Sequence, residues 1–244
     1  MTLPPGFEEW GEHFAISLPE ARVSFTTRRD GYSKGPFESL NLGRLTADEP
    51  EAVDRNRARV RDQVGRRLAM VHQVHGATVH RAETLPDAPD LAKGDGIVAT
   101  GPELAPLVFV ADCLPVAVAG DGAVAMLHAG WRGLSEGILA RGVAAVRDAA
   151  AKDGVLEAAI GPGIQVCCYE VGEEVHEAFA SYGPAVRHGD NLDLAAVART
   201  QLRQAGVEAV HDLGLCTACS PELFFSHRRD HGVTGRQAGI AWLT

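Results

Sequence analysis

The sequence has no long hydrophobic run. A membrane-spanning helix needs about 20 consecutive apolar residues, and no stretch of the 244 residues approaches that length. The first residues, MTLPPGFEEWGEHF, also have neither the basic start nor the apolar core of a secretory signal. We therefore expect a cytoplasmic protein with no membrane partner.

The sequence also has no excess of positive charge. Its formal net charge is -9, whereas a nucleic-acid-binding face needs clustered lysine and arginine, so we expect no nucleic-acid partner. The composition is that of an ordinary globular protein, and its 45% of hydrophobic residues is enough to bury a sizeable core. No repeat or Gly-rich linker divides the chain. Residues 1–244 are therefore predicted to form one domain of mixed strands and helices.

Cysteines are few, and their number, five, is odd. A chain of this length needs no disulfide to be stable, so reduced thiols are expected. Four cysteines allow two interpretations. They form either a four-thiolate zinc site or a set of reduced core thiols, and we favour core thiols because adjacent cysteines are poorly suited to share one tetrahedral ion. The four are Cys167, Cys168, Cys216 and Cys219.

The fifth cysteine and two histidines suggest a metal site. Cys113 and His128 each end an apolar run, so two soft ligands leave two strands at the same level. The segment VHQVHG offers His72 and His75, which point to opposite faces if the segment is extended. We choose His75 because the adjacent Gly76 permits close approach. Three such ligands with an open fourth position are typical of catalytic zinc; the alternative is a buried thiol beside a core histidine.

Arginines lie in two segments that could bind an anion. A helix is predicted from Ser135, as its cap, to about Ala151, which places Arg132 beside a helix N-terminus that favours phosphate or carboxylate. The alternative is an arginine paired with a surface acid. In FFSHRRDHGVTGR we expect at least one of Arg228 and Arg229 to reach the site, because arginine suits a bidentate grip on phosphate.

Two further polar residues have alternative roles. Asn41, in SLNLG, is a candidate for hydrogen bonding a substrate, or else bonds its own loop. Asp95, in DGIVAT, either supports a zinc-bound histidine or is a turn residue, which we favour.

Periodicity and capping predict the main elements. Helices are expected at 50–64, 172–182 and 194–204, strands at 21–27, 95–100, 158–163 and 238–243, and paired strand segments at 69–81.

Four motifs in order, QVHG, ADCLPV, HAGWRG and TGR, resemble those of the YfiH family, also called the laccase-domain or multicopper polyphenol oxidase family. The resemblance extends from SLNLG to the C-terminal GIAWL. It implies an α+β fold, a single-domain layered αββα sandwich of mixed sheets. It also implies zinc bound by His75, Cys113 and His128, which would be the catalytic centre.

The activity that this resemblance implies is zinc-dependent purine nucleoside phosphorolysis of adenosine, inosine and 5'-methylthioadenosine, with adenosine deaminase activity. The partners would be a nucleoside and phosphate, and the protein a monomer or weak dimer. One alternative is a cysteine-type amidase that edits peptidoglycan precursors. Copper-dependent polyphenol oxidation is less favoured, because the ten histidines include no HxH pair, although Cu²⁺ can replace zinc in such a site.

Overall fold

The computed structural model describes residues 2–85, 91–120, 122–150 and 154–244. It contains two six-stranded mixed sheets. In the first sheet, neighbouring strands are antiparallel except for the last pair, which is parallel. In spatial order these strands are β1 (Phe7–Trp10), β2 (His13–Leu18), β3 (Ala21–Phe25), β14 (Gln237–Leu243), β7 (Leu104–Val110) and β4 (Arg67–Ala69).

The second sheet has parallel pairs at both edges and antiparallel pairs between them. In spatial order its strands are β13 (Ala209–Asp212), β10 (Glu157–Ile160), β8 (Leu114–Gly120), β9 (Ala123–Ala129), β6 (Gly96–Ala99) and β5 (Val79–Arg81). A separate two-stranded sheet consists of β11 (Arg187–His188) and β12 (Asn191–Leu192).

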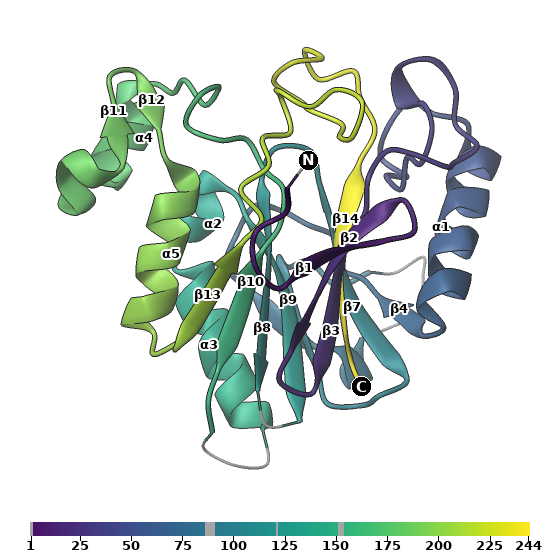
Figure 1. The fold of residues 1–244 in the computed structure, drawn as a ribbon, viewed down its shortest axis with the longest axis horizontal. Helices are drawn as coiled ribbons and strands as arrows, with labels where there is room; N and C mark the ends of the chain where they lie inside the picture. Colours follow the sequence, from purple (N-terminus) through teal and green to yellow (C-terminus); the bar gives the residue numbers. More distant parts are fainter. Residues whose placement is uncertain (1, 86–90, 121, 151–153) are drawn as a thin grey trace.

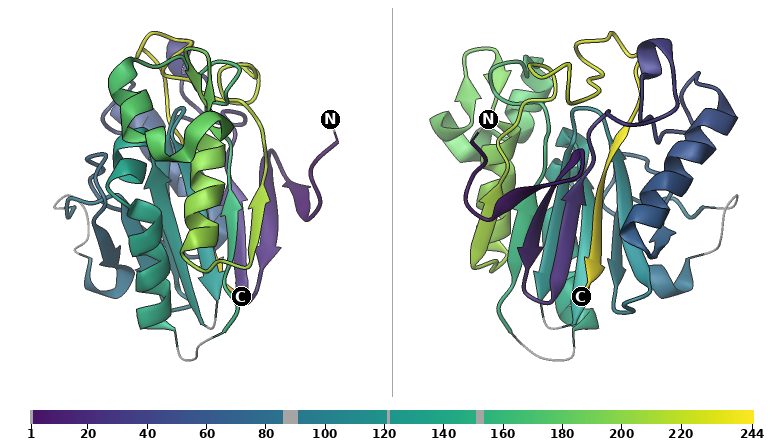
Figure 2. Two further views of the ribbon diagram at one scale, coloured as in Figure 1. Left: turned by 90° about the vertical axis from the view of Figure 1, so that its left-hand side faces the viewer. Right: turned by 45° about the vertical axis from the view of Figure 1, so that its right-hand side comes forward.

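Helices cover the outer faces of the two large sheets (Figure 1). The α-helices are α1 (Pro50–Val64), α2 (Trp131–Ser135), α3 (Ile138–Ala149), α4 (Glu173–Ala178) and α5 (Leu194–Gln204). The described residues also form the short 3-10 helices η1 (Gly35–Phe37), η2 (Ala82–Thr84) and η3 (Ala180–Ala185). Helix α1 packs on the first sheet, and α3 and α5 pack on the second. Figure 2 shows the resulting layers from two further sides.

Strand alternation explains why the layers form. In β8, Val116 and Val118 pack toward α3 and α5, whereas Ala117 and Ala119 face the first sheet. Every residue of β8 and β9 is buried, because both faces of these strands are covered. Phe25, fully buried between the sheets, is one of the side chains that close this interface. The predicted αββα sandwich of mixed sheets is confirmed.

Two predicted helices are correct to the residue. Helix α1 covers 50–64 and α5 covers 194–204 as expected. The cap of α5 is Asp193, whose carboxylate accepts the Ala196 N–H at 2.8 Å.

Three predictions were wrong in detail. Ser135 does not cap a long helix; it is the last residue of α2, and α3 begins at Ile138 after Gly137, whose φ of 84° breaks the helix. The segment 69–81 is mostly loop, since β4 and β5 belong to different sheets. The helix expected at 172–182 is shorter: α4 ends at Ala178, and the 3-10 helix η3 follows it.

The long segments 26–49, 161–193 and 213–236 lie at the same end of the molecule, at the top of Figure 1. Among the described residues, no helix has the length and apolar character required to cross a membrane.

Candidate metal centre

The structure brings together the three predicted ligands. The donor atoms of His75, Cys113 and His128 all lie within 4.8 Å of one another, and the two imidazole rings meet edge to face, with 4.8 Å between centroids. His75 lies in the loop between β4 and β5, Cys113 between β7 and β8, and His128 near the end of β9. Both loops cross from the first sheet to the second, so the cluster lies where the two sheets are connected.

His75, and not His72, lies beside Cys113 and His128, but the extended conformation expected for this segment was wrong. The segment is not a strand there: His75 has a φ of 61°, in the left-handed region. His72 instead pairs through its backbone with Lys93. The loop is held by Gln73, whose amide group both donates to the Phe109 carbonyl at 2.9 Å and accepts from the Phe109 N–H at 2.8 Å.

The carboxylate of Asp95 hydrogen-bonds both histidines of the cluster. Its fully buried carboxylate accepts the backbone N–H groups of Val74, His75 and Gly76 at 3.1, 2.9 and 2.8 Å, and bonds Nδ1 of His128 at 2.8 Å. Nδ1 of His128 is thereby occupied, and His128 also has a side-chain hydrogen bond with Cys113. A carboxylate behind a histidine is a frequent arrangement in metal sites. The favoured interpretation of Asp95 as a turn residue is therefore wrong.

The charges in the cluster favour an ionised thiol. Burial opposes ionisation of Cys113, but the adjacent His128 and His75 lower the pKa of its thiol below the usual value. Burial likewise opposes protonation of His128, whereas Cys113 and Asp95 raise its pKa. The thiolate is the form that binds metals and acts as a nucleophile.

Asp112, beside Cys113, joins three loops. Its backbone has a φ of 96°, which is costly for a residue other than glycine. Its carboxylate accepts Oγ1 of Thr217 at 2.6 Å and the N–H of Arg228 at 2.7 Å, and its carbonyl accepts the Ile164 N–H at 2.8 Å. Sequence reasoning missed this role, although the ADC motif contained the residue.

Two predicted substrate contacts are corrected. Asn41 is fully buried; its amide donates to Thr46 and Asp48 and accepts from Gly43 and Arg236, so it has no group left for a ligand. The alternative, bonding within its own loop, accounts for three of these four partners, and Arg236 adds a bond from a distant segment.

Arg229 is similarly occupied. Its guanidinium bonds Asp230 twice and the carbonyls of Thr217 and Phe224 at 2.8 and 2.9 Å. It supports the loop instead of facing a ligand.

Arg228 and Arg132 lie near Tyr169, as Cys113 does. Both act electrostatically on the phenol of Tyr169; burial and the nearby Cys113 raise the pKa of that phenol above its usual value. Arg228 donates to the Glu170 carbonyl at 2.7 Å, and Arg132 is exposed beside the Trp131 ring. These two arginines are the predicted anion-binding residues that retain free donors.

Arg236 is a further cation near the cluster that the sequence reasoning did not select. Burial lowers the pKa of its guanidinium, and Cys113 and Asp112 act in the opposite direction. The TGR motif contained this residue.

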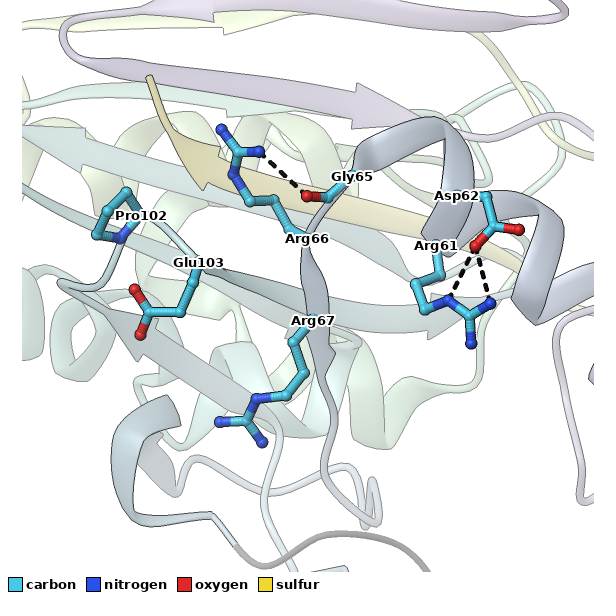
Figure 3. A pocket seen from close by; sticks show the side chains of 7 residues that line it. All are labelled: Arg61, Asp62, Gly65, Arg66, Arg67, Pro102 and Glu103. Atoms are coloured by element: carbon cyan, nitrogen blue, oxygen red, sulfur yellow. Dashed lines mark hydrogen bonds and ion pairs between the residues drawn. The ribbon is translucent and has the colours of Figure 1, made fainter.

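A separate surface hollow of about 920 Å³ lies at the end of α1 (Figure 3). Arg61 there bonds Asp62, and Arg66 donates to the Gly65 carbonyl. The residues that line the hollow include no cysteine or histidine. We therefore place the candidate centre at the Cys113 cluster.

Comparison with known proteins agrees with the predicted resemblance. The family model described as multi-copper polyphenol oxidoreductase laccase matches residues 22–244. A purine nucleoside phosphorylase of Xylella fastidiosa is 38% identical over 249 residues, covering 92% of this chain and 94% of the relative. The purine nucleoside phosphorylase YfiH of Shigella flexneri is 37% identical over 229 residues, covering 89% and 92%.

Solved structures agree as well. The protein NMB0706 of Neisseria meningitidis is 36% identical with a TM-score of 0.83, covering 98% of this chain and 99% of that one. YlmD from Geobacillus stearothermophilus is 32% identical with a TM-score of 0.87 and the same coverage.

Proposed function

This chain belongs to the multi-copper polyphenol oxidoreductase laccase family, and from that membership we propose that it is a zinc-dependent purine nucleoside phosphorylase. The relatives that carry this name support an enzyme. The observation that carries the proposal is the cluster of His75, Cys113 and His128 with Asp95 behind it.

The residues of the cluster fit zinc. One sulfur and two imidazole nitrogens are a donor set that zinc prefers, and the three donor atoms already lie within 4.8 Å of one another. A zinc ion held there would supply positive charge and an open coordination position. Asp95 fixes the ring of His128, and its three backbone hydrogen bonds fix the loop of His75. The ligand positions are therefore set by the protein before an ion binds.

In the proposed reaction, an oxygen of phosphate forms a bond to the anomeric carbon of the nucleoside. The bond from that carbon to the purine nitrogen breaks, and the base leaves with the electron pair and takes up a proton. Arg228 and Arg132 would hold the phosphate and stabilise charge as the bonds change. Tyr169, whose raised pKa keeps its proton, would donate a hydrogen bond to the bound substrate.

The proposed substrates are adenosine, inosine and 5'-methylthioadenosine, with hydrolytic deamination of adenosine as a second activity. Both reactions act on a purine nucleoside held at the same centre. We propose a cytoplasmic enzyme that needs no nucleic acid or membrane partner and works as a monomer or weak dimer.

The test is a product assay on wild type and Cys113→Ala with each nucleoside and inorganic phosphate. With the wild type, adenosine and inosine should give free base and ribose 1-phosphate, and 5'-methylthioadenosine should give adenine and 5-methylthioribose 1-phosphate. Inosine should also form from adenosine, and the variant should make none of these products. Zinc should be present in the wild type at this site and lost in the variant. Equal rates in the two proteins would refute the proposal.

The two neighbouring arginines give a matched comparison. Arg228→Met should raise the KM for phosphate about tenfold or more, because it removes one charge-assisted contact, with little change in stability. Arg229→Met should instead lower the free energy of unfolding by about 2–4 kcal/mol, because the carbonyls of buried Thr217 and Phe224 and the half-buried carboxylate of Asp230 lose their donor. A phosphate KM that rises only in Arg229→Met would contradict this assignment.

A cysteine-type amidase acting on peptidoglycan precursors is the second candidate. The position of the Cys113 thiol between two imidazoles favours it, since this arrangement also suits a nucleophile with its base. Alkylation distinguishes the two functions. A metal-held thiolate should resist iodoacetamide until a chelator is added, whereas a free nucleophile should react at once.

Copper-dependent oxidation of polyphenols has less support. Several copper ions need many imidazoles, and of the two ligand clusters found among the described residues, one has two histidines and the other has none. Cu²⁺ can nevertheless replace zinc in the Cys113 cluster, because it binds N and S donors more tightly.

A further inference from the structure

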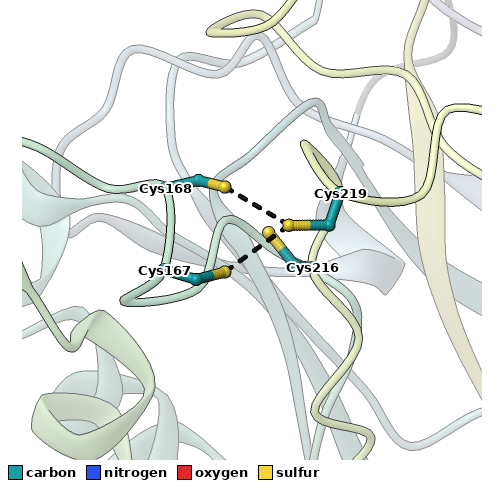
Figure 4. Close-up of side chains that lie close together, drawn as sticks. All are labelled: Cys167, Cys168, Cys216 and Cys219. Carbon is teal, nitrogen blue, oxygen red and sulfur yellow. Dashed lines mark hydrogen bonds between the residues drawn. The ribbon is translucent and has the colours of Figure 1, made fainter.

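A second cluster of soft ligands lies in the loops at the same end of the molecule. The sulfurs of Cys167, Cys168, Cys216 and Cys219 all lie within 4.8 Å of one another. Cys219 is 3.3 Å from Cys168 and 3.6 Å from Cys167, sulfur to sulfur, and the four side chains converge from two loops (Figure 4). One loop follows β10 and the other follows β13.

Three of these four residues are not core thiols, which corrects the favoured sequence interpretation. Cys167 and Cys219 are exposed, Cys168 is half-buried, and Cys216 alone of the four is buried. Partly exposed thiols gain little from burial, so packing does not explain why four of them converge.

Adjacency of two cysteines does not prevent their convergence here. The backbone N–H groups of Cys168 and Tyr169 both bond the carbonyl of Gln165, so the chain turns tightly at this point. Both sulfurs of the pair thereby reach Cys219 from the same side (Figure 4).

The fourth sulfur accepts backbone hydrogen bonds. Gln165 donates its N–H to Sγ of Cys216 at 3.5 Å, and the backbone of Cys219 also bonds this sulfur. Such bonds stabilise a thiolate, the form that binds metal. They also connect the two loops and fix the CxxC turn.

The dimensions match a tetrahedral ion. With zinc–sulfur bonds of about 2.3 Å, neighbouring sulfurs of a tetrahedron lie about 3.8 Å apart, within the spacing of this cluster. A disulfide would join two sulfurs and leave the approach of the other two unexplained. We propose that Cys167, Cys168, Cys216 and Cys219 bind a zinc ion in a closed, structural four-thiolate site.

This second ion would support the first centre. Thr217, between the two cysteines of the CxxC turn, donates to Asp112 beside Cys113 at 2.6 Å. Tyr169 directly follows Cys168 and interacts electrostatically with Cys113. The proposed ion thus holds together two loops that contact the candidate centre, whatever reaction takes place there.

The test uses full-length protein purified under reducing conditions without chelator. Wild type should contain two zinc ions per chain, and Cys113→Ala one. X-ray absorption of the zinc in Cys113→Ala should give a shell of sulfur alone at about 2.3 Å. This measurement leaves the four cysteines intact, so it does not depend on a variant of the cluster folding.

Variants of the cluster separate the two sites. Cys219→Ser should lose one zinc ion, and the double variant Cys113→Ala/Cys219→Ser should lose both ions. Ser220→Ala, in the same loop, is the control and should keep both ions. Wild type with a single zinc that is lost in Cys219→Ser and kept in Cys113→Ala would support this site and refute zinc at Cys113. A zinc-free Cys113→Ala, nitrogen or oxygen in its zinc shell, or a Cys168–Cys219 disulfide in the purified protein would overturn the proposal.

Discussion

Replacing Asp95 with asparagine tests how the candidate centre is organised. The carboxylate accepts three backbone N–H groups and bonds Nδ1 of His128. Asparagine has one acceptor oxygen, so its amide NH₂ must face donors at the other position. If the oxygen stays with His128, the bonds from Val74 and Gly76 are lost, because both end on the other carboxylate oxygen.

The expected cost follows from these bonds. Hydrogen bonds to charged groups are worth about 1.5–3 kcal/mol each, so losing two lowers the free energy of unfolding by about 3–6 kcal/mol. Loss of a carboxylate behind a metal-binding histidine typically weakens zinc binding by about 10- to 100-fold, which corresponds to about 1.4–2.8 kcal/mol. Asp95→Asn should therefore reduce both the free energy of unfolding and the affinity for zinc.

The assay is competition with a chromophoric chelator, with the affinity corrected for the folded fraction measured by circular dichroism. It is read in Cys219→Ser, so that the second proposed ion does not contribute. Glu83→Gln is the matched control, because Glu83 also accepts hydrogen bonds from the backbone of Thr100 and Gly101 but contacts no ligand of the cluster. Unchanged zinc affinity in folded Asp95→Asn would refute this account of the centre.

Two further predictions concern a steric contact and a buried histidine. Gly130→Ala should weaken zinc binding at least tenfold, because a Cβ there would lie 2.9 Å from Sγ of Cys113. Gly172→Ala is the control, because Gly172 has similar backbone angles but open space around it, and zinc affinity should not change when it is measured by the same competition. Burial lowers the pKa of His13, whose Nδ1 accepts the Thr27 N–H. Just below pH 6.5 the unfolded chain therefore binds more protons than the folded protein does. As the pH falls through that range, the free energy of unfolding decreases by at most about 1.4 kcal/mol per pH unit. Urea unfolding at pH 7.5, 6.5 and 5.5 should show this loss in wild type and a smaller one in His13→Gln; parallel profiles would contradict it.

Much of the fold could be predicted from local sequence signals. Helix α5 has its cap at Asp193, and α1 begins at a proline, so both were predicted with correct ends. The long helix from Ser135 was wrong because Gly137 adopts a left-handed conformation that the apolar periodicity does not reveal. The layered arrangement came from family resemblance, since pairing between distant strands is not a local property.

The candidate site likewise combines residues that local sequence signals identify with residues whose roles depend on contacts between segments. Cys113 and His128 could be predicted because each ends an apolar run, and His75 because a glycine follows it. Arg229 was misassigned because sequence spacing does not show how an irregular loop folds: its partners Asp230, Phe224 and Thr217 are near in sequence, but no periodic element places them around the guanidinium. Asn41 also bonds residues near in sequence, and its bond from Arg236 comes from a segment far along the chain. The role of Asp95 depends on the contact between its segment and the loop of His75, which sequence spacing does not contain.

The position of β14 affects the order in which this protein can fold during synthesis. Residues Gln237–Leu243 lie between β3 and β7 in the first sheet (Figure 1). Until they leave the ribosome, β3 and β7 each present an unpaired edge, and unpaired edges are sites of aggregation. A nascent chain that stops before Gln237 should therefore depend on chaperones, however complete its other sheet is.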